Sequence, residues 1–390
     1  MGPNSSALFR AGGRPSCFAM LLGRQCTDYS MQNDKDRYWD CLDQAMDASH
    51  SGRVEEALAW LEEALKAHPG GAEAHNGRGE ILWDEGRVDE SLYEFECAIE
   101  ADPKFSSAHM NRLEILIEEL AEYRLALEAC DELLAGRALL PRLDSTFQAE
   151  ICYLKSKALF YQDDLQGAVF LIRRSLKAMG DHPTYSAFEG HVLFEMGEYR
   201  TARRVLERTS MVDPDSSHVA YSLGLVLERI AYGEEADVSP MMSDEARVAS
   251  EASFQRACSL DPIQFPMPLE VSDTFFSEAV DAAVKNLPAS VRAYIENVPL
   301  VVEDFPTVEM VKNERVSPQI LGLFMGIPRT EAILTEQVPD LDRVLLFKRN
   351  LEKHCRTRDE LIDQIQITVR HEIGHYLGLD EDDLERLGLA

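Results

Sequence analysis

Apolar and small residues return at fixed offsets along residues 37–262, with a helical spacing inside each segment and a longer period between segments. The longer period is the distance from Gly52 to Gly86, which is thirty-four residues. The matched positions are Gly52, Ala57, Leu61, Ala64 and Pro69, then Gly86, Ser91, Phe95, Ala98 and Pro103, then Gly197, Ala202, Leu206, Thr209 and Pro214, and in part Phe254, Ala257 and Pro262. Glycine permits a tight turn between helices, small residues allow close approach, and proline stops the second helix. Because one helix pair cannot bury its apolar face alone, the pattern predicts stacked pairs, a right-handed solenoid with a concave groove.

The segment "AHNGRGEILWDEGRVDESLYEFECAIEADP" resembles a tetratricopeptide repeat. We count about six units between residues 37 and 262, and the third and fourth are degenerate. An insertion at 232–244, "YGEEADVSPMMSD", separates the two helices of the sixth unit. The resemblance implies that the groove binds a protein or peptide partner, and the alternative is a scaffold that binds none.

The period ends at Pro262, and the prolines of "IQFPMPLEVSD" indicate a boundary. Beyond it, Ser272 or Asp273 can cap a helix that ends before Leu287 and Pro288. Residues 298–306, "VPLVVEDFP", and 343–350, "RVLLFKRN", are predicted strands, and 321–329, "LGLFMGIPR", is a strand or a loop. We therefore expect a small α+β domain after the solenoid.

The last long helix carries the candidate chemistry. Thr357 and Glu360 match a capping box at its start, and Gly378 allows a left-handed turn at its end. His371 and His375 are four residues apart, so they lie on one helix face and both imidazoles can reach one ion. Two surface histidines on a solvated helix end are the alternative interpretation.

With Glu372 between them, these histidines form the HExxH arrangement of zinc metallopeptidases. Zn²⁺ bound by two neutral histidines and one carboxylate keeps a position for water, whose pKa falls towards about 7. We expect Glu372 to act as the general base that removes the proton of this water as it attacks a peptide carbonyl.

The third metal ligand is less clearly specified. Glu381 lies where metzincin-like enzymes place theirs, but Asp380, Asp382 and Asp383 are adjacent, and a water is a further alternative. Asp380 can instead cap a short terminal helix whose other acids favour the helix dipole. Both interpretations can hold together.

Residues 268–390 resemble the minimal zincins, small bacterial predicted zinc metallopeptidases. The resemblance rests on "FFSEAVDAAVKNLPASVRAYIENVPLVVEDFP", "LGLFMGIPRTE" and the segment from Arg343 to Leu389. It implies a compact zincin fold in which His371, His375 and an acid after the glycine bind zinc and Glu372 is catalytic. That family typically has aspartate where this chain has Glu381. The chain after His375 is too short for the methionine turn of larger metzincins, so we expect upstream strands to support the substrate, with "RVLLFKRN" as a candidate edge.

Composition narrows the functional classes. The formal net charge of −30 argues against a nucleic-acid partner, and no uninterrupted apolar run is long enough to span a membrane. Eight scattered cysteines without a CxxC pair are typical of a reducing cytoplasm, which is the predicted compartment. The first residues are rich in Gly, Ser and Arg and are expected to form a disordered tail, with a weak export signal as the alternative.

The predicted fold is mainly α: a tail at 1–36, a tetratricopeptide-repeat α-solenoid at 37–265 and a minimal zincin domain at 266–390. The predicted function is a zinc metallopeptidase that cleaves a protein or peptide recruited by the repeats. The alternative is a non-catalytic interaction scaffold whose metal-binding domain is silent or structural.

Overall fold

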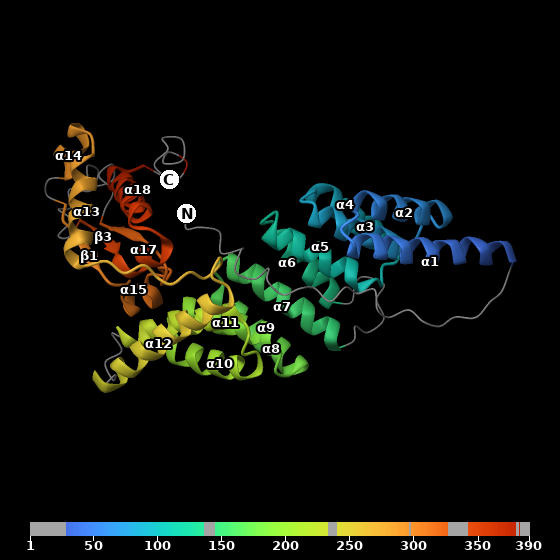
Figure 1. Ribbon diagram of the computed structural model, residues 1–390, viewed down its shortest axis with the longest axis horizontal. Helices are drawn as coiled ribbons and strands as arrows, with labels where there is room; N and C mark the ends of the chain where they lie inside the picture. Colours follow the sequence, from blue (N-terminus) through green and yellow to red (C-terminus); the bar gives the residue numbers. More distant parts are fainter. Residues whose placement is uncertain are drawn as a thin grey trace. The chain divides into compact units, whose positions relative to one another are not determined.

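The computed structural model describes residues 29–135, 145–232, 240–295, 298–326, 342–379 and Asp382 (Figure 1). These residues divide into two compact units that meet in sequence between Tyr185 and Ser186. The predicted boundary at 265/266 therefore lies inside the second unit. The last part of the predicted tail is helical from Tyr29, and residues 1–28 lie outside the described part of the chain.

The first unit consists of helices that pack on their neighbours in sequence. They are α1 (Tyr29–His50), α2 (Val54–Ala67), α3 (Ala72–Asp84), α4 (Val88–Ala101), α5 (Ser106–Glu118), α6 (Tyr123–Leu134), α7 (Ser145–Tyr161) and α8 (Leu165–Met179). Gly52 and Gly86 have φ values of 69° and 75°, so both turns use the left-handed region that glycine adopts freely. Ala57 and Ser91 are fully buried, as expected for the small positions where paired helices approach.

The helical pairs continue into the second unit with α9 (Pro183–Glu195), α10 (Tyr199–Val212), α11 (Ser217–Ala231) and α12 (Pro240–Leu260). Within the described residues, α1 to α12 follow one another along the chain as helices, and the count of about six repeat units stays a prediction. The predicted insertion overlaps α12 from Pro240 onwards, and residues 233–239 lie outside the description.

The C-terminal part of this unit combines short helices and strands. Its elements are α13 (Asp273–Lys285), α14 (Ala289–Ile295), β1 (Leu300–Glu303), α15 (Val308–Asn313), β2 (Gly322–Met325), β3 (Arg343–Phe347), α17 (Lys348–His354) and α18 (Arg358–Leu377). Ser272 caps α13 by accepting a hydrogen bond from the Phe275 N–H, at 3.2 Å, which confirms one of the two predicted caps. The fold is thus mainly α with a small α+β domain at its end.

The three described strands form one sheet in the order β1-β3-β2. β1 runs parallel to β3, with Leu300 opposite Val344, and β2 runs antiparallel to it, with Phe324 also opposite Val344. The prediction that "RVLLFKRN" provides a free edge is wrong, because β3 is the central strand and pairs on both sides. Its side chains Val344 to Phe347 are almost completely buried, which explains the apolar run better than an edge position does.

The core of the C-terminal domain lies between α13, the sheet and α18. It contains the fully buried Phe276, Leu346, Leu351, Leu361, Ile365 and Val369. The apolar face predicted for the last helix therefore packs inward. This packing holds α18 against the sheet and determines which of its residues remain near the surface.

Helix α11 of the repeats contacts the C-terminal domain within the second unit. Lys353 Nζ lies 2.7 Å from Glu228 Oε2, and both side chains are mostly buried. The neighbouring Arg229 donates to the Pro306 carbonyl at 2.5 Å. Burial lowers the pKa of Lys353, and the Glu228 carboxylate opposes that shift. The last described repeats and the C-terminal domain thus share buried polar contacts.

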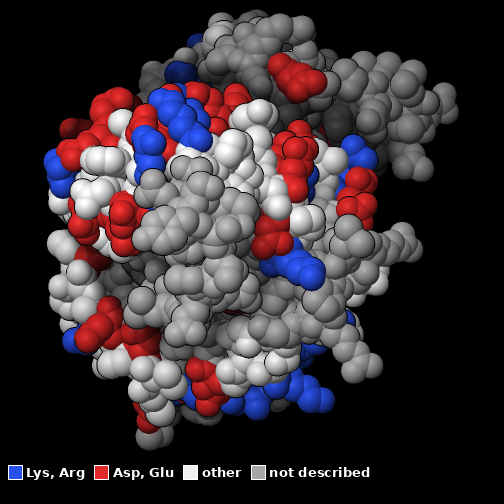
Figure 2. Space-filling model, turned by 90° about the vertical axis from the view of Figure 1, so that its right-hand side faces the viewer, with Lys and Arg blue, Asp and Glu red and all other residues white. Residues whose placement is uncertain are grey.

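None of the helices in the described residues is both long enough and apolar enough to cross a membrane. On the face drawn in Figure 2, acidic side chains are spread widely, with basic side chains in smaller groups between them. Some exposed charges of the protein pair over one helical turn, as in Arg87, which precedes α4, and Glu90 of α4, whose atoms approach to 2.6 Å. Such exposed pairs contribute little to stability.

Candidate metal centre

The two ends of α18 are fixed by side-chain and backbone caps. Thr357 Oγ1 accepts from the Glu360 N–H at 3.2 Å, and Glu360 Oε2 accepts from the Arg356 N–H at 2.7 Å. The predicted capping box is confirmed, although its return bond reaches the residue before the cap. Gly378 has φ 86°, and the Leu379 N–H donates to the Gly374 carbonyl at 3.0 Å, a Schellman ending.

His371 and His375 converge on one point at the C-terminal end of this helix. Their Nε2 atoms lie 3.0 Å apart, and their rings are nearly perpendicular, with centroids separated by 4.6 Å. His375 Nδ1 faces the Leu379 carbonyl at 3.3 Å. A carbonyl only accepts, so this contact places a proton on Nδ1 and makes Nε2 the unprotonated nitrogen of the His375 ring.

This pair fits a metal ion by distance and by chemistry. Two nitrogens at about 2.0–2.1 Å from one zinc in a tetrahedral site lie about 3.3 Å apart, close to the separation between the two Nε2 atoms. A cation held by both Nε2 lone pairs would replace the N–H···N hydrogen bond that the two rings can make at this distance. Within the described residues, however, no third His, Cys, Asp or Glu joins them to complete a group of three.

The expected third ligand falls outside the described part of the chain. Glu381, Asp380 and Asp383 are not described, and Asp382 is exposed. The assignment of Glu381 therefore stays a prediction.

Glu372 lies beside the histidines and is 6% exposed. Its Oε2 accepts a hydrogen bond from the Phe324 N–H of β2 at 2.7 Å. The Phe347 N–H donates to the carbonyl of Leu321, the residue just before β2, so the backbone groups of Leu321 point towards β3. Successive residues of a strand point their backbone groups to opposite sides. The N–H and carbonyl of Phe324 therefore point away from β3. The Glu372 carboxylate is thus held at the edge of β2 that faces away from β3.

Gly322 permits this close approach between β2 and α18. A Cβ at this position would lie 2.6 Å from Thr368 Cγ2 and 3.0 Å from Glu372 Cγ. Sequence reasoning did not identify Gly322 or Phe324 as parts of the site. A glycine inside a predicted strand was the available signal, since it often marks a close backbone approach.

Comparisons with known families identify both parts of the chain. Residues 42–104 match the sequence model of the family described as tetratricopeptide repeat. Residues 295–389 match that of the family described as zincin-like metallopeptidase, and this segment contains His371, Glu372 and His375. No curated protein matches the chain.

Several solved structures are similar to parts of this chain. PilF of Pseudomonas aeruginosa is 16% identical, with a TM-score of 0.47 over 59% of this chain and 95% of its own. MamA from Desulfovibrio magneticus RS-1 is 17% identical, with a TM-score of 0.39 over 46% of this chain and 96% of its own. YrrB, described as a TPR protein with an unusual peptide-binding site, is 15% identical, with a TM-score of 0.35 over 52% of this chain and 93% of its own. The chain thus contains a segment that matches the tetratricopeptide-repeat family and, after it, a segment that matches the zincin-like metallopeptidase family.

Proposed function

We propose that this protein is a zinc-dependent peptidase whose repeats recruit the protein or peptide that it cleaves. The observation that carries the proposal is the arrangement at the end of α18. There the Nε2 atoms of His371 and His375 converge at 3.0 Å, next to the buried carboxylate of Glu372.

His371 and His375 would hold the metal through Nε2, with Glu381 as the proposed third ligand. Bound zinc supplies a water whose pKa falls towards about 7. The contact of His375 Nδ1 with the Leu379 carbonyl supports this role, because it keeps the imidazole in the tautomer that ligation requires.

Glu372 would accept the proton of the attacking water and deliver it to the leaving amine. One of its oxygens, Oε2, is bound to the Phe324 N–H, which fixes the orientation of the carboxylate. Burial of the side chain excludes bulk water from this proton transfer.

The proposed substrate position is the edge of β2 that faces away from β3. An extended peptide can add to a free sheet edge through its main chain, so its sequence requirements come mainly from side-chain pockets. This edge carries the Phe324 N–H that holds Glu372, and a peptide bound there would pass close to the catalytic carboxylate. We place the scissile bond here rather than at β3, which is covered on both sides.

The proposed partner of the repeats is a protein or a peptide segment, because stacked helix pairs present an extended surface for such ligands. Recruitment in this way would restrict cleavage to proteins that the solenoid holds.

The proposal is tested by cleavage of a proteome-derived peptide library. We expect new peptide termini with the zinc-loaded protein, their loss after treatment with a chelator, and their return when zinc but not magnesium is restored. Cleavage that survives full removal of the metal would contradict the proposal. A protein that binds zinc and a protein partner without any cleavage would support the scaffold alternative.

A further inference from the structure

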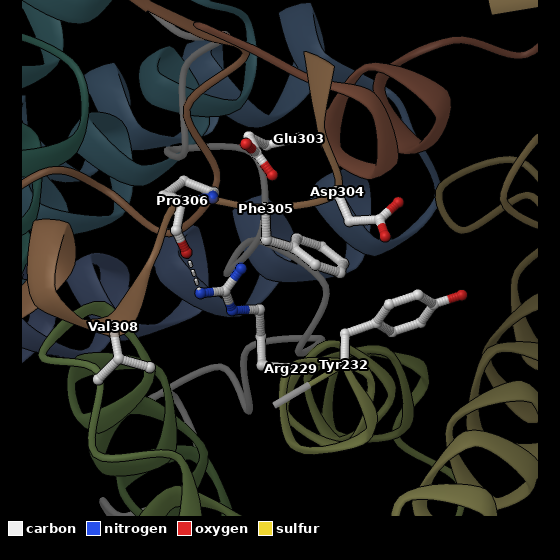
Figure 3. Close-up of a pocket in the computed structure, with 7 residues that line it drawn as sticks. All are labelled: Arg229, Tyr232, Glu303, Asp304, Phe305, Pro306 and Val308. Carbon is white, nitrogen blue, oxygen red and sulfur yellow. Dashed lines mark hydrogen bonds between the residues drawn. The ribbon is translucent and has the colours of Figure 1, made fainter. Parts of the chain in front are cut away.

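A pocket lies on the side of the sheet away from β2, where the chain leaves β1 and faces helix α11 of the repeats (Figure 3). Its volume is about 220 Å³. Sites for drug-sized ligands measure about 300–1,000 Å³, so this pocket suits a smaller molecule. Its lining residues are Arg229, Tyr232, Glu303, Asp304, Phe305, Pro306 and Val308.

Arg229 is a buried cation without a carboxylate partner in the described part of the chain. The residue is 7% exposed, and only its Nη2 makes a hydrogen bond, to the Pro306 carbonyl. Its Nε and Nη1 are buried and have no hydrogen-bond partner among the residues that the structure describes. The guanidinium lies against the Phe305 ring, with Cζ 4.6 Å from the ring centroid. A buried guanidinium is costly unless its donors are satisfied, and this one retains donors for an anion.

The neighbouring acids do not supply that anion. Glu228 binds Lys353 at 2.7 Å, and Asp304 lies 3.8 Å from Arg349 Nε. Glu303 is exposed at the end of β1, and its carboxylate has no ion pair or hydrogen bond among the described residues. Figure 3 shows the Glu303 carboxylate turned towards the part of the pocket that holds the Arg229 guanidinium. As far as the described residues go, the pocket therefore presents one cation and one anion that are not paired with each other or with a neighbour.

We propose that this pocket binds a free α-amino acid or a very short peptide with an apolar side chain. The ligand carboxylate would bind Arg229, its ammonium group would bind Glu303, and its side chain would lie against Phe305 and Val308. A phosphate fits less well, because its second negative charge would face Glu303 and Asp304. This site is separate from His371, Glu372 and His375, so the proposal holds whether or not the protein is a peptidase.

Isothermal titration calorimetry on the full chain tests the proposal with three related probes. We expect L-leucine to bind. N-acetyl-L-leucine, which lacks the ammonium group, and L-leucinamide, which lacks the carboxylate, should each bind about tenfold more weakly or worse. Equal binding of N-acetyl-L-leucine or of inorganic phosphate would overturn the proposal in favour of a simple anion site. No binding of L-leucine would also overturn it.

Two variants locate the site. Arg229→Met should abolish binding, but it also removes the contact to Pro306 and can impair folding. Glu303→Gln avoids this problem because the side chain is exposed, and it should weaken L-leucine binding about tenfold while leaving N-acetyl-L-leucine unchanged. Glu309→Gln, an exposed change on the nearby α15, should leave both affinities unaltered. Wild-type affinity in Glu303→Gln would contradict the assigned role of the carboxylate.

Discussion

The Nε2 atoms of His371 and His375 lie 3.0 Å apart at the C-terminal end of α18, with the carboxylate of Glu372 on the same turn of the helix. At this distance the two rings can make an N–H···N hydrogen bond, and loss of that proton would leave both Nε2 lone pairs for one cation. The four-residue spacing on one helix thus places the two Nε2 atoms at a distance that suits metal binding.

The first prediction concerns metal content. The purified protein should bind close to one zinc ion per chain, and His371→Ala or His375→Ala should remove most of it, because each change deletes one ligand. Elemental analysis after dialysis measures this directly. His354→Ala, an exposed histidine of the same domain, is the matched control and should retain full zinc. Full retention in both ligand variants would refute the assignment.

The second prediction concerns the packing of β2 against α18. Gly322→Ala places a methyl group 2.6 Å from Thr368 Cγ2 and should lower the free energy of unfolding by about 1–3 kcal/mol. It should also reduce any peptidase activity, because β2 must shift away from Glu372. Thr368→Ser removes the first clash, so the double variant should regain part of the stability. A Gly322→Ala protein with wild-type stability would show that β2 and α18 do not approach closely at this position.

The third prediction concerns the contact between the repeats and the C-terminal domain. Glu228→Gln leaves the buried Lys353 without its carboxylate and should cost about 3 kcal/mol of stability. The exposed pair Glu198 and Lys312 is the control, and Glu198→Gln should cost no more than about 1 kcal/mol. Chemical denaturation measures both. Equal costs would mean that the buried pair is not formed in solution.

The same contact bears on the predicted boundary at 265/266. A fragment of residues 266–390 lacks Glu228 and Arg229, whereas a fragment of residues 186–390 retains them. We therefore expect the longer fragment to unfold at a higher temperature, while both bind zinc through α18. A metal-free shorter fragment would show that the repeats complete the domain.

The fourth prediction concerns pH. Burial lowers the pKa of His191 from its usual 6.5 to about 4. Between pH 4 and pH 6.5 the unfolded chain therefore carries a proton on His191, whereas the folded chain does not. The contribution of neutral His191 to the stability of the fold is thus fully present above about pH 6.5 and is lost as the pH falls towards 4. This difference in pKa corresponds to about 3 kcal/mol of stability. His191→Leu should flatten this part of the stability profile, and His50→Leu, at an exposed histidine, should not.

Most of the fold could be predicted from the sequence because its signals are local. The interval from Gly52 to Gly86 indicates a turn that recurs between helices, and Thr357 with Glu360 indicates where a helix begins. These features depend on a few neighbouring residues, and the structure confirms them. The spacing of His371 and His375 likewise predicted their convergence, because four residues make about one helical turn.

The remaining features depend on contacts between distant segments. The central position of β3 was missed because a short apolar run has the same pattern at an edge as in the middle of a sheet. The bond from the Phe324 N–H to Glu372 joins residues far apart in sequence, and no residue type signals a backbone donor. Arg229 was not singled out either, because its burial depends on Phe305 and Pro306 from the other domain.

The most direct test of the central claim compares zinc-loaded wild type with zinc-loaded Glu372→Gln on the same peptide library, with new termini counted by mass spectrometry. Glutamine keeps the shape of the side chain and can still accept from the Phe324 N–H, but it cannot take a proton. The variant should therefore retain zinc and thermal stability while cleavage falls by about 10² to 10⁴. A Glu372→Gln protein that cleaves at the wild-type rate, or a zinc-loaded wild type that produces no new termini, would contradict the account.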